Sequence, residues 1–251
     1  MIDQCIDIRK DTVFDADNSF SPESFAFDKR VVNVFDDMVN RSVPGYETIQ
    51  LLVADLALHF NRKSLIYDLG CSTGNTILSL LKRTNKPLRI IGVDNSVDML
   101  AECKSKLTDI PDRHRIELVD QDLSSRFVYE NGKADVVILN LALQFIRPLL
   151  RPDILQNAYQ NIEPGGCLIL VEKTIQNDQE LNKLFIDYYH CYKKEMGYSD
   201  LEISNKREAL ENKLIPFFLD ENIALLKETG FSHVSQFFQW MNFSGILAIK
   251  D

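Results

Sequence analysis

The stretch DLGCSTG, residues 68–74, has the residue types of a turn that holds a small molecule. Gly70 and Gly74 have no side chain, so they adopt unusual backbone angles at low cost and let the backbone approach a ligand closely. An apolar run precedes the turn and a helical pattern follows it, which places the turn between a strand and a helix. The pattern alone also fits an ordinary strand-to-helix turn, so further residues have to decide between the two.

A carboxylate follows at the spacing that ribose recognition requires. Asp94, in GVDNS, closes the next apolar run about 20 residues beyond the turn, where its oxygens can accept hydrogen bonds from both ribose hydroxyls. Asn95 beside it could contact an adenosine or cap the next helix. Folds that bind nicotinamide dinucleotides share this arrangement with folds that bind S-adenosylmethionine. Asp94 therefore predicts a nucleoside-containing ligand without deciding between them.

Five short apolar runs predict the strands that carry these residues. They are continuous rather than alternating, which is typical of strands buried on both faces of a parallel sheet. Helical patterns separate most of them, so the chain is expected to form an α/β sheet with helices on both faces. The predicted strands are residues 64–69, 88–94, 115–120, 134–140 and 166–172.

The end of the chain predicts a different connection. Residues 231–250 hold two extended runs with Asn242 between them, which leaves no room for a crossover helix. We expect an antiparallel hairpin at the sheet edge, giving a mostly parallel sheet of seven strands, whereas dehydrogenase-type sheets end with another parallel strand. Residues 29–60 are predicted to be helical with a break at SVPGY (42–46). Residues 173–230 form a mostly helical insertion, far longer than a usual connection of about 2–6 residues.

The turn resembles the Gly-rich loop of the Rossmann-like S-adenosylmethionine-dependent methyltransferases, with Ser72 in place of the middle glycine. The resemblance implies that Gly70, Cys71 and Ser72 face the methionyl part of the cofactor. It also implies that Asp122, in VDQDLSS, and the amide of Leu123 hold the adenine, although a solvated turn aspartate fits as well. Asn140 would lie against cofactor or substrate, or would simply form a turn.

Longer blocks narrow the resemblance. FDDMVNRSVPGYETI, GYSDLEISNKREALENKLIP, LNLALQFI and PGGCLILVEK are similar to carboxy-S-adenosyl-L-methionine synthase, from about residue 25 to the C-terminus. That family combines S-adenosylmethionine and prephenate to give carboxy-S-adenosylmethionine and phenylpyruvate. A separate enzyme uses the product to modify the wobble uridine of transfer RNA. The resemblance further implies a homodimer.

The same resemblance assigns two more residues. Arg207, in ISNKRE, matches the arginine that binds the new carboxylate, and its planar guanidinium can form two parallel hydrogen bonds with such a group. Without the resemblance, Arg207 would be interpreted as an exposed helix residue paired with Glu211. On a helix, the neighbouring Lys206 would project in a different direction from Arg207. Tyr46 matches a residue that contacts the cofactor, but on its own it would be a half-buried tyrosine at a helix start. Because prephenate itself can supply the base, no catalytic triad is required.

The composition argues against a nucleic-acid-binding, metal-binding, membrane or secreted protein. The chain has 251 residues, a net charge of −9 and no basic stripe, which argues against direct binding of nucleic acid. Five scattered cysteines and four histidines lack metal-ligand or disulfide spacing, so no metal is expected. The sequence shows neither an apolar run of about 20 residues nor a signal-peptide pattern, so we expect a cytoplasmic protein. Its predicted organisation is a loose arm at residues 1–24 and a single domain at residues 25–251.

Two alternatives remain open from the sequence. An ordinary methyltransferase on the same fold would act on a small molecule or on transfer RNA, and it would have no need of a cation such as Arg207 near the transferred methyl. A non-catalytic S-adenosylmethionine-binding protein would bind the cofactor and turn over nothing. Such a sensor would be expected to carry an added DNA-binding or partner-binding element, and the sequence shows none.

Overall fold

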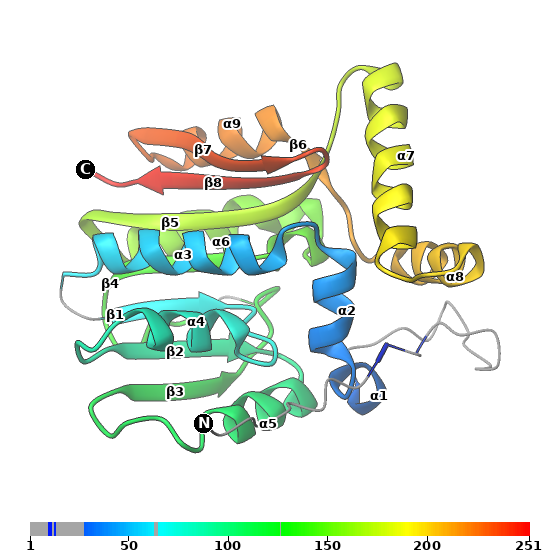
Figure 1. Cartoon of the computed structure of the whole chain (residues 1–251). Coiled ribbons are helices and arrows are strands. Elements are labelled where there is room, and N and C mark those ends of the chain that lie inside the picture. Colours follow the sequence, from blue (N-terminus) through cyan, green and yellow to red (C-terminus); the bar gives the residue numbers. More distant parts are fainter. Residues whose placement is uncertain (1–9, 12, 14–27, 63–64, 126) are drawn as a thin grey trace.

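The computed structural model describes residues 10–11, 13, 28–62, 65–125 and 127–251. Its sheet has the strand order β3-β2-β1-β4-β5-β8-β7, and the short β6 pairs with β5 (Figure 1). The path from β3 to β5 is parallel, whereas β8 runs antiparallel to both β5 and β7. The strands are β1 Leu65–Leu69, β2 Arg89–Asp94, β3 Arg115–Asp120, β4 Ala134–Asn140, β5 Ile162–Ile175, β6 Phe217–Phe218, β7 His233–Trp240 and β8 Phe243–Ile249. The predicted parallel sheet with a C-terminal antiparallel hairpin is confirmed.

Helices cover both faces of this sheet (Figure 1). Helices α3, α4 and α5 pack on one face, and α6 and α9 pack on the other. The predicted break at residues 42–46 separates α2 from α3. The helices are α1 Lys29–Val32, α2 Phe35–Ser42, α3 Tyr46–Phe60, α4 Asn75–Arg83, α5 Val97–Lys106, α6 Arg151–Gln160, α7 Gln179–Glu195, α8 Asp200–Leu210 and α9 Leu219–Thr229, with short 3-10 turns at Leu143–Phe145 and Pro148–Leu150.

The central strands are apolar on consecutive positions because each face meets its own helical layer. In β1, Ile66 packs toward α3 and α4, and the next residue, Tyr67, packs into the opposite core. Val136 and Val137 in β4 divide in the same way. Every residue of β1 is buried, so the hydrophobic effect fixes the strand from both sides.

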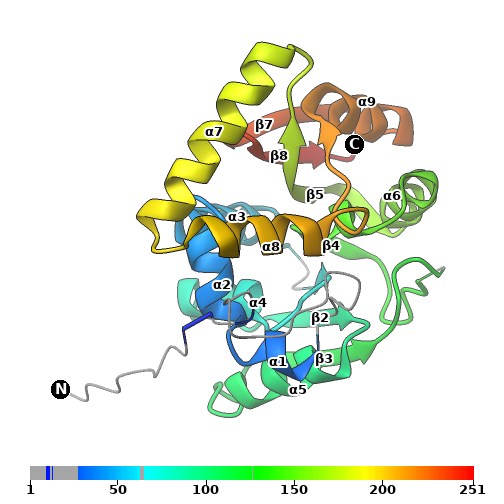
Figure 2. The ribbon, with the colours of Figure 1, turned by 90° about the vertical axis from the view of Figure 1, so that its right-hand side faces the viewer.

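The segment between β5 and the hairpin has two parts. Helix α9 packs against α6 and β7, so it belongs to the layer on the sheet. Helices α7 and α8 stand away from the sheet, beyond the carboxyl ends of the parallel strands (Figures 1 and 2). A capping box of Ser199 and Glu202 begins α8. Of the predicted arm at 1–24, only Lys10, Asp11 and Val13 lie within the described residues.

Candidate functional site

A cavity of about 670 Å³ lies at the carboxyl edge of the sheet. Its walls come from the Gly-rich turn, the ends of β2, β4 and β5, and helices α2, α7 and α8. Parallel strands bring their carboxyl ends to one edge, so loops that are distant in the sequence meet there. All the residues predicted to bind the ligand line this cavity: Tyr46, Gly70, Cys71, Ser72, Asp94, Asn95, Asp122, Leu123, Asn140 and Arg207.

The Gly-rich turn requires glycine at two positions for both conformation and space. Gly70 has a φ of 84°, and a Cβ there would come within 2.5 Å of the Cβ of Ala142. Gly74 has a φ of 82°, and its Cβ would lie 2.5 Å from the sulfur of Cys103. Ser72, at the position of the middle glycine, also has a positive φ of 49°. The backbone of the turn is thus held in an unusual conformation against the cavity.

Asp94 is fastened to the turn by its carboxylate. One oxygen accepts a hydrogen bond from the amide of Ser72 at 2.9 Å, and the other accepts one from the amide of Ser96 at 2.9 Å. Burial raises the pKa of Asp94, while these backbone hydrogen bonds act in the opposite direction. A carboxylate can accept about four hydrogen bonds, so Asp94 can position the turn and still accept a hydrogen bond from a ribose.

The loop after β3 and the last residue of β4 supply further polar groups. The carboxylate of Asp122 accepts a hydrogen bond from the amide of Ser124 at 2.8 Å, so this residue forms a turn and also lines the cavity. The amide nitrogen of Asn140 donates to the hydroxyl of Thr76 at 3.2 Å. Its side-chain oxygen is buried and has no hydrogen-bond partner within the described chain. A buried acceptor without a partner at a cavity wall fits a donor on a ligand.

Tyr46 begins helix α3 and contributes its hydroxyl to the same wall. Asn75 donates a hydrogen bond to the Tyr46 hydroxyl at 3.2 Å and another to Asp36 at 2.9 Å. Burial raises the pKa of Tyr46 to about 12, so the phenol stays neutral at physiological pH. Tyr46 can therefore donate its own proton in a hydrogen bond.

Arg207 lies on α8, where it is exposed to solvent and lines the cavity. No carboxylate, including that of Glu211, pairs with its guanidinium in the described part of the chain. Its positive charge lowers the pKa of His190 and of Lys193, although burial is the largest cause for both residues. The guanidinium thus contributes positive charge on the α7 side of the cavity.

Lys206, next to Arg207, has a role that the sequence did not reveal. Its ammonium donates to the hydroxyl of Ser42 at 2.7 Å and pairs with Asp11 at 3.4 Å. The Tyr198 hydroxyl donates to the same Asp11 carboxylate at 2.6 Å. Asp11 is 1% exposed. Burial lowers the pKa of Lys206 to about 8, and the carboxylate of Asp11 acts against this shift. This network joins α8 to α2 and to the start of the described chain.

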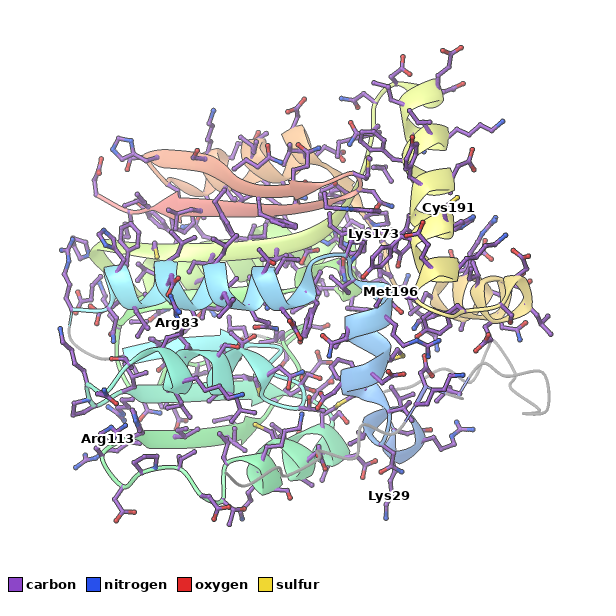
Figure 3. The ribbon with its side chains drawn as sticks, in the orientation of Figure 1. Lys29, Arg83, Arg113, Lys173, Cys191 and Met196 are labelled. Atoms are coloured by element: carbon purple, nitrogen blue, oxygen red, sulfur yellow. The ribbon has the colours of Figure 1, made fainter. Side chains whose placement is uncertain are left out.

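Sequence reasoning also missed Lys173 and Lys193. Lys173 lies near the end of β5, between the sheet and α7 (Figure 3), and Lys193 lies on α7 three residues after His190. All three line the cavity. A polar residue after a buried strand was a signal for Lys173, but its convergence with α7 depends on tertiary packing.

Asp68, in β1, is buried and has no hydrogen-bond partner among the described residues. It is 1% exposed, and neither carboxylate oxygen has a hydrogen bond to another described residue. Burial, and secondarily the charge of Asp94, raises its pKa to about 7. A carboxyl group beneath the ligand-binding turn is thereby held close to its titration point at neutral pH.

The described residues contain no cluster of three or more His, Cys, Asp or Glu side chains that could bind a metal ion. Among the same residues, no helix has the length and apolar character needed to span a membrane.

The strand order, the glycine turn and the carboxylate at the end of β2 define a protein of the S-adenosylmethionine-dependent methyltransferase fold. A family model described as a methyltransferase domain matches residues 66–166. An O-methyltransferase family protein from Burkholderia thailandensis superposes with a TM-score of 0.65 at 20% identity, covering 89% of this chain and 60% of that one.

Two curated relatives define the family more closely. The carboxy-S-adenosyl-L-methionine synthase of Desulfotalea psychrophila is 45% identical over 96% of this chain and 98% of its own length. The synthase of the same name from Methylococcus capsulatus is 42% identical over 96% of this chain and 99% of its own length. The chain belongs to the carboxy-S-adenosyl-L-methionine synthase family of enzymes.

Proposed function

We propose that this chain converts S-adenosylmethionine and prephenate into carboxy-S-adenosylmethionine and phenylpyruvate. The observation that carries the proposal is the guanidinium of Arg207, which has no carboxylate partner among the described residues and lines the same cavity as the Gly-rich turn. An ordinary methyl transfer leaves no anion on the sulfonium side, whereas the carboxylated product needs a cation at that point. The names of the two related synthases support the same reaction.

The chemistry balances without a base from the protein. Prephenate loses carbon dioxide and hydroxide as its ring becomes aromatic, which leaves phenylpyruvate. The hydroxide takes a proton from the methyl group of S-adenosylmethionine, whose acidity is raised by the sulfonium, and forms water. The resulting carbanion attacks carbon dioxide, and the new carbon–carbon bond gives the carboxylate. The protein's part is to hold both substrates in contact and to exclude bulk water.

The described residues divide this work. The turn at Gly70–Ser72 approaches the methionyl part, and Asp94 accepts hydrogen bonds from the ribose. Asp122 and the amide of Leu123 hold the adenine, and Asn140 offers its unpaired oxygen to a donor on the ligand. Tyr46 contacts the cofactor from α3, and Arg207 binds the new carboxylate.

The test is to incubate the purified protein with S-adenosylmethionine and prephenate and to analyse the small molecules by mass spectrometry. A species heavier than S-adenosylmethionine by one carbon dioxide, formed together with phenylpyruvate, is expected. Release of the demethylated product without a carboxylated species would instead indicate a methyltransferase. Binding of S-adenosylmethionine with no turnover would indicate a non-catalytic S-adenosylmethionine-binding protein.

The product would supply a separate enzyme that modifies the wobble uridine of transfer RNA. The net charge of −9 supports a division of labour in which this chain does not itself bind the nucleic acid. Synthesis of a donor for transfer RNA modification also places the protein in the cytoplasm.

We further propose that two copies pair through the outer face of α7. Leu181, Leu184 and Tyr188 lie at helical spacing on this face and are 47%, 46% and 53% exposed. The cavity-lining residues of α7, Ile186 and Tyr189 among them, occupy the opposite side of the helix. An exposed apolar row on a helix that also forms the site supports a self-complementary dimer contact.

A further inference from the structure

Two lysines converge on one aromatic ring in the cavity. The ammonium nitrogen of Lys173, on β5, lies 4.8 Å from the centre of the Tyr189 ring, and that of Lys193, on α7, lies 4.4 Å from it. Lys193 is only 5% exposed. Neither lysine pairs with a carboxylate anywhere in the described part of the chain. Two ammonium groups beside one ring and largely out of water are costly unless an anion compensates their charge.

Two other lysines do have acidic partners. Lys206 lines the cavity and pairs with Asp11 at 3.4 Å, and Lys106, which donates a hydrogen bond to the cavity residue Asn75, pairs with Asp36 at 2.5 Å. The buried ammonium of Lys206 is thus compensated by a carboxylate of the chain itself. Lys173 and Lys193 lack this compensation within the described residues, as expected for groups that meet an anionic ligand.

The positive charge gathers from three elements. Burial lowers the pKa of Lys193 to about 7, and the charges of Lys173, Lys206 and Arg207 contribute to the shift. Burial also lowers the pKa of Lys173 to about 8. The pKa of His190 falls because of burial and then the charges of Lys193, Lys173 and Arg207. The ends of β5, α7 and α8 therefore direct cations at one corner of the cavity.

We propose that Lys173 and Lys193 form a second anion subsite, which binds the carboxylate that a keto-acid substrate keeps through the reaction. The subsite lies in the same cavity as Arg207, which faces the carboxylate that is transferred. This assignment rests on the proposed function, because a substrate with two carboxylates needs cations at two places. Tyr189 holds the two ammonium groups through the face of its ring and supplies an apolar surface beside them.

The first experiment compares Lys173→Met and Lys193→Met with Lys194→Met. Methionine keeps most of the length and removes the charge, and Lys194 is the next residue on α7, where it pairs with Asp200 at the surface. Each subsite variant is expected to raise the KM for prephenate about 10-fold or more, as for loss of a charged hydrogen bond. The KM for S-adenosylmethionine and the Kd of carboxy-S-adenosylmethionine should stay within about 2-fold, and Lys194→Met should change none of these values.

The second experiment measures binding of phenylpyruvate by calorimetry and needs no turnover. Loss of phenylpyruvate affinity in Lys193→Met but not in Lys194→Met supports the subsite even if prephenate is not converted, in which case the proposed function alone fails. Normal turnover with an unchanged KM for prephenate in both subsite variants overturns the subsite and leaves the reaction standing. Equal phenylpyruvate affinity in the parent and in all the variants also overturns the subsite. Retained S-adenosylmethionine binding shows that a variant is folded. If Lys193→Met does not fold, Lys193→Gln takes its place.

Discussion

The ligand beside Arg207 would gain a carboxylate during the proposed reaction. Arg207→Ala should therefore weaken binding of carboxy-S-adenosylmethionine about 10- to 100-fold, the cost of one to two charge-assisted hydrogen bonds. Binding of S-adenosylmethionine should hardly change. Calorimetric titration with both ligands measures the difference, and Arg83→Ala, at a surface pair with Asp55, serves as the control. Equal losses for the two ligands would assign Arg207 to the fold rather than to the carboxylate.

Asp94 is assigned to the ribose, which S-adenosylmethionine and carboxy-S-adenosylmethionine have in common. Its replacement by alanine removes the acceptor for a ribose and also the brace on the amides of Ser72 and Ser96. Both ligands should lose affinity together, by about 10-fold or more. A loss confined to one ligand in the same titrations would argue against the ribose assignment.

Asp68 should make the stability of the ligand-free protein depend on pH. Its folded pKa of about 7 lies above the ordinary value of 3.8, so the folded state binds this proton more tightly than the unfolded chain does. The stability associated with Asp68 is complete below about pH 4 and declines as pH rises through 7. Asp68→Asn removes the decline, so its free energy of unfolding should exceed that of the parent by up to about 4 kcal/mol at pH 8 and by little at pH 4.

Urea unfolding at several pH values tests this expectation, with Asp109→Asn at an exposed position as the control. Parallel stability curves for the parent and Asp68→Asn would show that the carboxyl group is not strained by burial.

At the scale of elements, the parallel strands were predictable because both of their faces are covered. The prediction for β5 was too short at both ends. Pro164 and Gly165 signal a break in a sequence, yet pairing of Ile162 with Ala134 starts the strand before them. Pairing of Thr174 and Ile175 with β6 extends its far end. Such lengths depend on neighbouring strands that a local pattern does not contain.

The ligand-binding turn offers a matched pair of glycine variants. Gly70 and Gly132 both have positive φ, but a Cβ at Gly70 would meet Ala142 at 2.5 Å, and a Cβ at Gly132 would meet nothing within 4 Å. Gly132→Ala should cost only backbone strain, about 1 kcal/mol. Gly70→Ala should cost about 2–4 kcal/mol and abolish most S-adenosylmethionine binding. Thermal unfolding with and without ligand measures both effects, and similar behaviour of the two variants would contradict the close approach at Gly70.

At the scale of the whole molecule, the site depends on contacts that join distant parts of the chain. The residues after strands could be predicted, because every parallel strand ends at the same edge. Lys173 follows a predicted strand, but its convergence with α7 could not be predicted. Lys193 and Lys206 could not be placed either, because α7 and α8 are positioned by packing against β5 and α2 and not by any local pattern. The role of Arg207 was predicted from the resemblance to the synthase family, whereas helical spacing alone favoured a surface ion pair with Glu211.

The proposed pairing through α7 gives a prediction at this scale. Leu184→Asp places a charge in the exposed apolar row and should turn a dimer into a monomer, because a buried unpaired carboxylate is costly at an interface. Light scattering after size-exclusion chromatography should then show the mass halved. Leu149→Asp, at a position 91% exposed and outside α7, should leave the dimer intact. A parent protein that runs as a monomer, or an unchanged dimer in Leu184→Asp, would place the interface elsewhere or remove it.

The ion pair between Asp11 and Lys206 spans 195 positions of the chain. At a synthesis rate of about 5–20 residues per second, the ribosome adds Lys206 about 10–40 seconds after Asp11. During that time Asp11 lacks its ammonium partner, while the Gly-rich turn and β2 are being made. The wall formed by α8 is therefore among the last parts of the cavity that a nascent chain can complete, and the full cavity exists only when translation is nearly finished.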